Sequence, residues 1–144
     1  MKAILINPRS KIISEVEFGG NYRDISKLIG ASLFTTVSLG DENLHTIFVD
    51  DEGLFVEDQC FWKWADYQQP LGGLGLILGT NDEGDSIAVV LTIEEVREKV
   101  SWLNIEYVAN QPIGGKITHP VYGEMTVIGG VPIFREKKES NNGH

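Results

Sequence analysis

Short apolar runs separated by turn residues constrain the fold of this 144-residue chain more than any other feature. The runs are rich in β-branched and aromatic residues, and Gly, Pro, Asn and Asp stand between them, as is typical of strands joined by tight turns. Residues 2–7 with 12–18 predict one hairpin, and residues 33–39 with 44–49 predict another. Residues 54–56 indicate a further short strand, and residues 73–78 and 87–91 a buried pair.

Two segments place apolar residues at helical spacing instead. The first begins at Asn21, a favourable N-cap, and stops at Gly30. The second begins at Thr92, which can form a capping box with Glu95. We expect it to reach Leu103 and to pack its apolar face on the sheet. That face consists of Ile93, Val96, Val100 and Leu103. These patterns together predict an α+β fold with a mostly antiparallel sheet and two helices.

The composition of the sequence changes after Asn104. Gly and Pro residues there punctuate short β-like runs, at residues 105–108, 116–118, 124–128 and 131–134. We interpret residues 1–104 as an α+β core domain and residues 105–135 as a C-terminal β-rich extension, with a single compact unit as the alternative. The charged and polar tail, residues 136–144, is expected to be disordered.

Composition excludes several classes of function. The net charge of −9 argues against direct nucleic-acid binding, which depends on Lys and Arg at phosphates. Cys60 is the single cysteine, so no intramolecular disulfide forms and a reducing cytoplasm is expected. No apolar run approaches the ~20 residues of a membrane span, and the run at residues 3–6 is too short for a signal peptide. We therefore expect a cytoplasmic protein without membrane association.

Acidic residues concentrate in one part of the chain. Residues 41–106 contain fifteen Asp and Glu but only three Lys and Arg. One interpretation is a solvated acidic face that aids solubility, and the other is a surface that steers a basic partner toward the protein.

The stretch from Phe61 to Ser86 contains the candidate binding residues. Trp62 and Trp64 are two residues apart, so on a strand they share a face. Aromatic side chains are enriched at binding hot spots, and glycines let another group approach the backbone. We predict a contact surface for a partner or ligand, formed by Trp62, Trp64, Tyr67, Gln69, Gly72 and Gly73. The alternative is that the aromatic residues belong to the core.

Recognisable cofactor and catalytic motifs are missing from the sequence. Gly72, Gly73 and Gly75 lack the spacing and the following helix of a phosphate-binding loop, and residues 81–85 lack the spacing of a calcium loop. The three histidines have no metal-ligand spacing, Cys60 has no histidine near it in sequence, and there is no Gly-x-Ser-x-Gly elbow. We therefore expect no catalytic residue, no metal site and no cofactor.

Several short segments also carry a family resemblance. They are, in order, MKAILINP at 1–8, YRDI at 22–25, VDDEGL at 49–54, YQQPL at 67–71, GLILGT at 75–80 and EGDS at 83–86. Together they resemble a family of small acidic domains of unknown function that bacteriophages and bacterial mobile elements carry. The resemblance covers about residues 1–103. It implies no established activity, cofactor or catalytic residue, but it implies an intracellular setting in a phage or mobile element.

Three hypotheses about function follow. The first is a non-catalytic accessory protein of a phage or mobile element, which binds a host protein, for example a defence component, and inhibits or redirects it in the host cytoplasm. The second is a sponge that sequesters a small nucleotide-like signal, with Arg23, Lys27 or Lys63 lining the pocket. The third is an enzyme without a recognisable motif. The sequence does not determine the oligomeric state.

Overall fold

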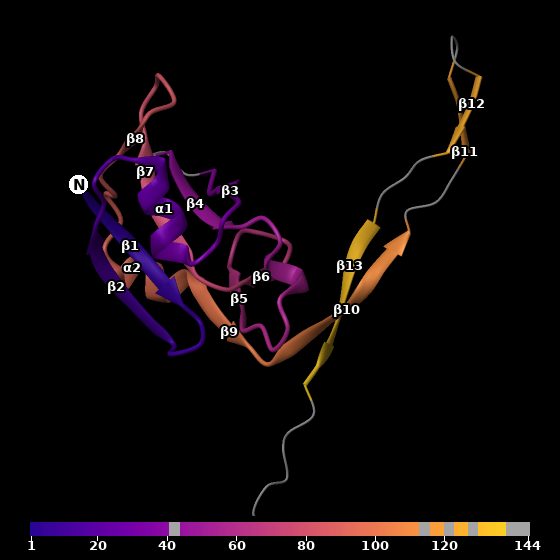
Figure 1. The fold of residues 1–144 in the computed structure, drawn as a ribbon, viewed down its shortest axis with the longest axis horizontal. Coiled ribbons are helices and arrows are strands. Elements are labelled where there is room, and N and C mark those ends of the chain that lie inside the picture. The colour runs from indigo at the N-terminus through magenta and orange to yellow at the C-terminus, as the bar shows by residue number, and fades with distance from the viewer. Residues whose placement is uncertain (41–43, 113–115, 120–122, 127–129, 138–144) are drawn as a thin grey trace, which may run out of the picture. The chain divides into compact units, whose positions relative to one another are not determined.

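The computed structural model describes residues 1–40, 44–112, 116–119, 123–126 and 130–137 (Figure 1). The chain divides into two compact units, of which the first is residues 1–104 and the second begins at Ile105. The predicted α+β class is confirmed, with two helices and antiparallel strands among the described residues.

The first unit is built on one antiparallel sheet, which has six strands in the described part of the chain. Its order is β2-β1-β7-β4-β3, and the short β8 pairs with β7. Both predicted hairpins are confirmed, as β1/β2 and β3/β4. The strands are β1 (Lys2–Asn7), β2 (Ile12–Glu17), β3 (Phe34–Ser38), β4 (His45–Asp50), β7 (Gly75–Thr80) and β8 (Ser86–Ile87).

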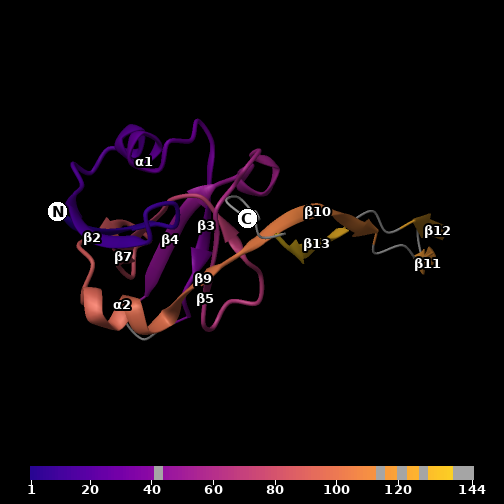
Figure 2. The same cartoon turned by 90° about the horizontal axis from the view of Figure 1, so that it is seen from below.

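Successive side chains of a strand point to opposite faces of the sheet. Both faces of this sheet carry apolar side chains, and both are covered. In β7, Leu76 and Leu78 contact one hydrophobic cluster while Ile77 contacts the other. Helix α1 (Tyr22–Ile29) covers the first face and helix α2 (Ile93–Lys99) the second, as Figure 2 shows. The second face is also covered by a smaller antiparallel sheet, β6-β5-β9, formed by β5 (Phe61–Trp64), β6 (Leu71–Gly72) and β9 (Val100–Leu103).

The capping of α1 agrees with the sequence. The Asn21 side chain accepts a hydrogen bond from the Arg23 N–H at 3.0 Å. Gly30 ends the helix in the left-handed region, with φ +68°, where glycine has no steric penalty. Of the residues expected at helical spacing, Tyr22, Ile25, Leu28 and Ile29, the two isoleucines are buried and Leu28 is half-buried, whereas Tyr22 is exposed.

Helix α2 starts where the sequence predicts but ends earlier. The Thr92–Glu95 capping box forms through two hydrogen bonds of 3.1 Å. The helix stops at Lys99, however, and the prediction that it continues to Leu103 is wrong. Residues 100–103, with a β-branched and an aromatic residue, form β9 and pair with β5, an arrangement that suits such residues better than a last helical turn.

Two other strand predictions are also wrong. Residues 54–56 do not form a strand, because residues 53–55 make a 3₁₀ turn, η1 (Gly53–Phe55). The strand expected at 87–91 ends at Ile87. Beyond it, the Val89 N–H bonds to the Lys2 carbonyl and the Val90 N–H bonds to His45 Nε2 at 3.1 Å. These donors have partners outside β7, so the β7–β8 ladder does not extend.

The second unit contains strands only, within its described residues. β10 (Ile105–Pro112) pairs with β13 (Gly130–Glu136) across a register shift between Tyr107 and Ala109. β11 (Lys116–His119) pairs with β12 (Gly123–Thr126). The expected β-rich character of the extension is therefore confirmed. The tail expected at 136–144 falls outside the described residues from 138 onward, and Glu136 belongs to β13.

The burial of Val96 generates a stability prediction. Val96 is the fully buried residue of α2. Val96→Asp places an unpaired carboxylate in the core, and we expect the free energy of unfolding to fall by about 3 kcal/mol or more, measured by urea denaturation. Glu98→Asp, which places the same side chain at an exposed position of the same helix, should change it by less than about 0.5 kcal/mol. Equal midpoints for the two variants would contradict this packing of α2.

Candidate functional site

The two tryptophans of the central stretch are core residues. Both lie on β5 in the cluster between the two sheets, where Trp62 is fully buried and Trp64 is 3% exposed. The Trp62 indole Nε1–H donates to the Gly73 carbonyl at 2.9 Å. The prediction that Trp62 and Trp64 form an exposed contact surface is therefore corrected, because the face that they share points into the core.

The glycines of this stretch accommodate internal groups rather than a ligand. A Cβ at Gly72 would lie 2.8 Å from the Gly53 carbonyl oxygen, a separation that real side chains do not adopt. Gly73 has φ +81° and lies beside the carboxamide of Gln59. Close backbone approach therefore explains both positions, and the approaching groups belong to the same chain.

Gln59 is a buried polar residue that sequence reasoning missed. Its Nε2 donates to the Gly53 carbonyl at 2.9 Å, and its Oε1 accepts from the Cys60 N–H at 3.1 Å. The side chain thus ties η1 to the start of β5. The sequence offered no signal for this role, because the contact with Gly53 depends on how the 53–60 loop closes.

Tyr67 and Gln69 line a cavity that we name the acidic hollow. Its volume is about 200 Å³, and it lies beside β3 and the end of β4. Tyr67 is half-buried and Gln69 is exposed. The polar residues in its lining are Thr35, Thr36, Asp50, Asp51, Tyr67 and Gln69. The structure therefore brings together Tyr67, Gln69 and Gly72 of the predicted surface and adds the residues Asp50 and Asp51 to the lining.

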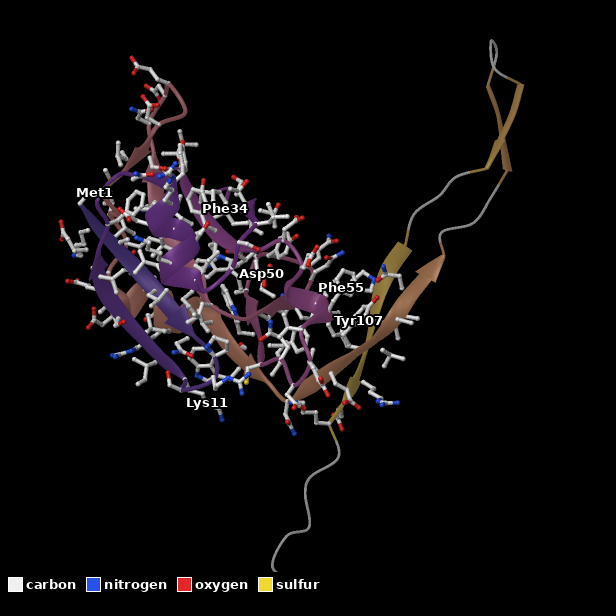
Figure 3. The ribbon with its side chains drawn as sticks, viewed as in Figure 1. Met1, Lys11, Phe34, Asp50, Phe55 and Tyr107 are labelled. Atoms are coloured by element: carbon white, nitrogen blue, oxygen red, sulfur yellow. The ribbon has the colours of Figure 1, made fainter. Side chains whose placement is uncertain are left out.

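Hydrogen bonds place Asp50 and Asp51 at the end of the sheet. The Asp51 N–H donates to the Leu33 carbonyl at 3.1 Å, just beyond the last β3–β4 pair. Asp50 pairs with Phe34 in the register of those strands, and its Oδ1 accepts from the Glu52 N–H at 2.9 Å. Both residues are labelled in Figure 3. No Lys or Arg is among the described residues that line the acidic hollow, so its field favours a cation.

A second cavity, the Arg9 hollow, also includes Asp50 in its wall. Its volume is about 300 Å³, and Asn7, Arg9, Cys60 and Gly73 contribute to its lining. The Arg9 guanidinium donates to the Asp58 carbonyl at 3.0 Å, and Asn7 Oδ1 accepts from the Arg9 N–H at 3.1 Å. The only cation in its described lining is therefore already engaged with the backbone.

The described residues contain neither a metal-binding cluster nor a membrane-spanning helix. No group of three or more His, Cys, Asp and Glu residues there is arranged to hold a metal ion. No helix in that part of the chain has the length and apolarity that a membrane crossing requires.

Comparisons with known proteins place the acidic hollow within a matched region. The model of the family described as Domain of unknown function (DUF3846) matches residues 1–101. The Uncharacterized protein y4iR of Sinorhizobium fredii (strain NBRC 101917 / NGR234) is 36% identical over 84 residues, which are 56% of this chain and 51% of that relative. The chain thus spans about half the length of the relative it matches. No solved structure matches the chain.

The burial of Trp64 generates the prediction for this subsection. Trp64→Ala should lower the free energy of unfolding by about 3–5 kcal/mol, because it leaves a cavity between the two sheets. Leu33→Ala is the control, since Leu33 is 60% exposed and its truncation should cost less than about 1 kcal/mol. Thermal and urea denaturation of both variants measure the difference. If the free energy of unfolding of Trp64→Ala equals that of the parent, the burial of Trp64 in the core is contradicted.

Proposed function

This chain belongs to the family described as Domain of unknown function (DUF3846), and from that premise we propose that it is a non-catalytic binding protein whose acidic hollow takes a basic side chain of a partner protein. In this proposal the partner is a host protein, with a defence component as one candidate. The chain acts in the host cytoplasm as an accessory protein of a bacteriophage or mobile element, and it inhibits or redirects the partner.

The observation that supports this proposal most directly is the composition of the acidic hollow. Asp50 and Asp51 stand in its wall without a Lys or Arg among the described lining residues. Tyr67 adds an aromatic surface with a phenol, and Gln69 adds a carboxamide that can donate and accept. A lysine or arginine side chain suits these groups, because its head bonds to carboxylates while its stem packs on the ring.

The size of the hollow favours a single side chain over a nucleotide-like ligand. Small-molecule sites typically have volumes of about 300–1,000 Å³, whereas the acidic hollow has about 200 Å³. Arg23, Lys27 and Lys63, the groups proposed to hold a phosphate, line neither this hollow nor the Arg9 hollow. Carboxylates at the wall also repel a phosphate. The sponge hypothesis is therefore the weaker one.

The chemistry of the hollow also gives little support to an enzyme. A nucleophile needs a base within hydrogen-bond reach. The hydroxyl of Tyr67 has no hydrogen-bonded carboxylate or imidazole among the described residues, and Asp50 holds a backbone N–H with Oδ1. We therefore propose binding without catalysis.

Photocrosslinking tests the site of binding. The chain is expressed in the host cell with a benzophenone amino acid in place of Gln69. It should crosslink to one protein, which mass spectrometry identifies. The same amino acid at Lys27 should not crosslink to that protein. Lys27 is exposed on α1, the helix that covers the other face of the sheet. Crosslinks of equal yield from both positions, or none from Gln69, would refute the proposal, and a co-purified small molecule would support the sponge.

Charge neutralisation tests the chemistry of binding. The double substitution Asp50→Asn with Asp51→Asn should weaken binding of the crosslinked protein by about tenfold or more in low salt, measured by calorimetry. It should also flatten the dependence of affinity on salt concentration, because two screened attractions are lost. The double substitution Asp82→Asn with Glu83→Gln, which removes two exposed charges in the 81–85 loop, is the control for net charge and should leave the affinity within about twofold. Equal losses for both variants would indicate steering by net charge alone.

A further inference from the structure

Strand β3 is the terminal strand of the main sheet, beyond β4 (Figure 1). In an antiparallel pair, alternate residues direct their N–H and C=O groups toward the partner strand. The bonds from Asp51 N–H to Leu33 O and from Leu39 N–H to His45 O flank the β3–β4 ladder. In that alternation Thr35 and Val37 bond to β4, and the outward groups belong to Phe34, Thr36 and Ser38.

This edge lacks the devices that usually protect a terminal strand. Edge strands are commonly blocked by charged residues, proline or bulges. The sequence of β3, FTTVS, contains no charge and no proline, and its register with β4 is continuous. At the other end of the sheet, β2 carries Glu15 and Glu17, which form ion pairs with Lys2 and the N-terminal amine. The two edges therefore differ, and β3 is the open one.

The open edge and the acidic hollow share the same strand. Thr35 and Thr36 line the hollow, and Asp51 bonds to the residue just before β3. Side chains of a strand added to β3 would alternate between the two faces of the sheet. Those directed to the α2 face reach the hollow, and those directed to the α1 face meet Phe34, on which the exposed Tyr22 ring stacks at a centroid distance of 6.3 Å.

We propose that the partner docks by adding an extended segment to the edge of β3, with a lysine or arginine of that segment in the acidic hollow. This inference rests on the proposed function and specifies how the partner binds. Main-chain hydrogen bonds to Phe34, Thr36 and Ser38 supply affinity, and the hollow supplies selectivity for the basic side chain.

Charge decides between a basic segment and a second copy of this chain as the occupant. The hollow presents Asp50 and Asp51 beside the edge, and each copy has a net charge of −9. Pairing two β3 edges would bring two such surfaces together, and like charges at an interface disfavour association. A segment with alternating basic residues complements the same surface.

Amide hydrogen exchange tests this geometry directly. The probe is a seven-residue peptide that alternates lysine and valine, at millimolar concentration, with the 1–144 chain. The amides of Phe34, Thr36 and Ser38 should exchange about tenfold more slowly in its presence, because they become hydrogen-bonded, while those of Thr35 and Val37 change little. A peptide N-methylated at the amides that face β3 should give no protection, and one methylated at the alternate amides should retain it.

A matched pair of variants isolates one outward donor. Thr36→Pro removes the outward N–H and leaves the ladder to β4 intact, since proline is tolerated on an edge whose N–H faces solvent. It should weaken peptide binding by about tenfold, whereas Thr36→Val, which keeps the N–H, should retain the affinity. If Thr36→Pro fails to fold, the methylated peptides give the same test on the parent chain.

The outcomes separate this inference from the proposed function. Unprotected Phe34, Thr36 and Ser38 amides, or equal effects of the two methylation patterns, overturn strand addition. The proposed function survives that result if Gln69 still crosslinks to one protein, and it fails if Gln69 does not. A third outcome is that, without peptide, the protection of these amides rises with the concentration of the chain. If sedimentation then also shows a dimer, the occupant of the β3 edge is a second copy and not a basic segment.

Discussion

The contact between the Trp62 indole and the backbone at Gly75 determines how the two sheets of the first unit pack. Trp62 lies on β5 in the smaller sheet, and Gly75 begins β7, the central strand of the larger one. A Cβ at Gly75 would lie 2.7 Å from Trp62 Cζ2, so this approach requires glycine. The indole N–H is also satisfied, by the Gly73 carbonyl, and a ring that brings both area and a hydrogen bond is costly to displace.

That packing also determines where the acidic hollow forms. With β5 held on β7, the chain from Tyr67 to Leu71 passes beside β3 and the end of β4. The close approach of Gly72 to Gly53 and the hydrogen bond from Gln59 to Gly53 then fix η1 on the same side. The hollow is thus a consequence of core packing. Part of its lining, at Thr35, Thr36 and Asp50, lies on strands of the main sheet, which is the kind of support that the proposed binding site requires.

Local patterns in the sequence predict the hairpins, α1 and the start of α2, because alternation and capping are properties of neighbouring residues. They do not predict where α2 ends, because residues 100–103 form a strand only when β5 is present to pair with them. The same reason explains the tryptophans. Trp62 and Trp64 do share a face, as their spacing predicts, but burial of that face depends on β7 and α2, which lie far from them in sequence.

The candidate site divides in the same way. Tyr67, Gln69 and Gly72 were predicted and do line the hollow, whereas Asp50 and Asp51 were not assigned to a site. The sequence did contain a signal, since an acidic pair directly follows the apolar run that predicts a strand at 44–49. The open edge of β3 has no local signature at all, because edge or central position is set by the order of strands in the sheet.

The acidic composition then has two separable effects on a basic partner. Among the described acidic residues of the first unit, Asp50 and Asp51 line the hollow, and at physiological salt a more distant charge acts over only about 8 Å. Such charges raise the rate of encounter, and they do so for any basic surface. In the proposed binding mode, selectivity has to come from groups close to the partner segment, which are Asp50 and Asp51 beside the β3 edge. The proposed partner would therefore differ from other basic proteins in having an extended segment that can reach both features at once.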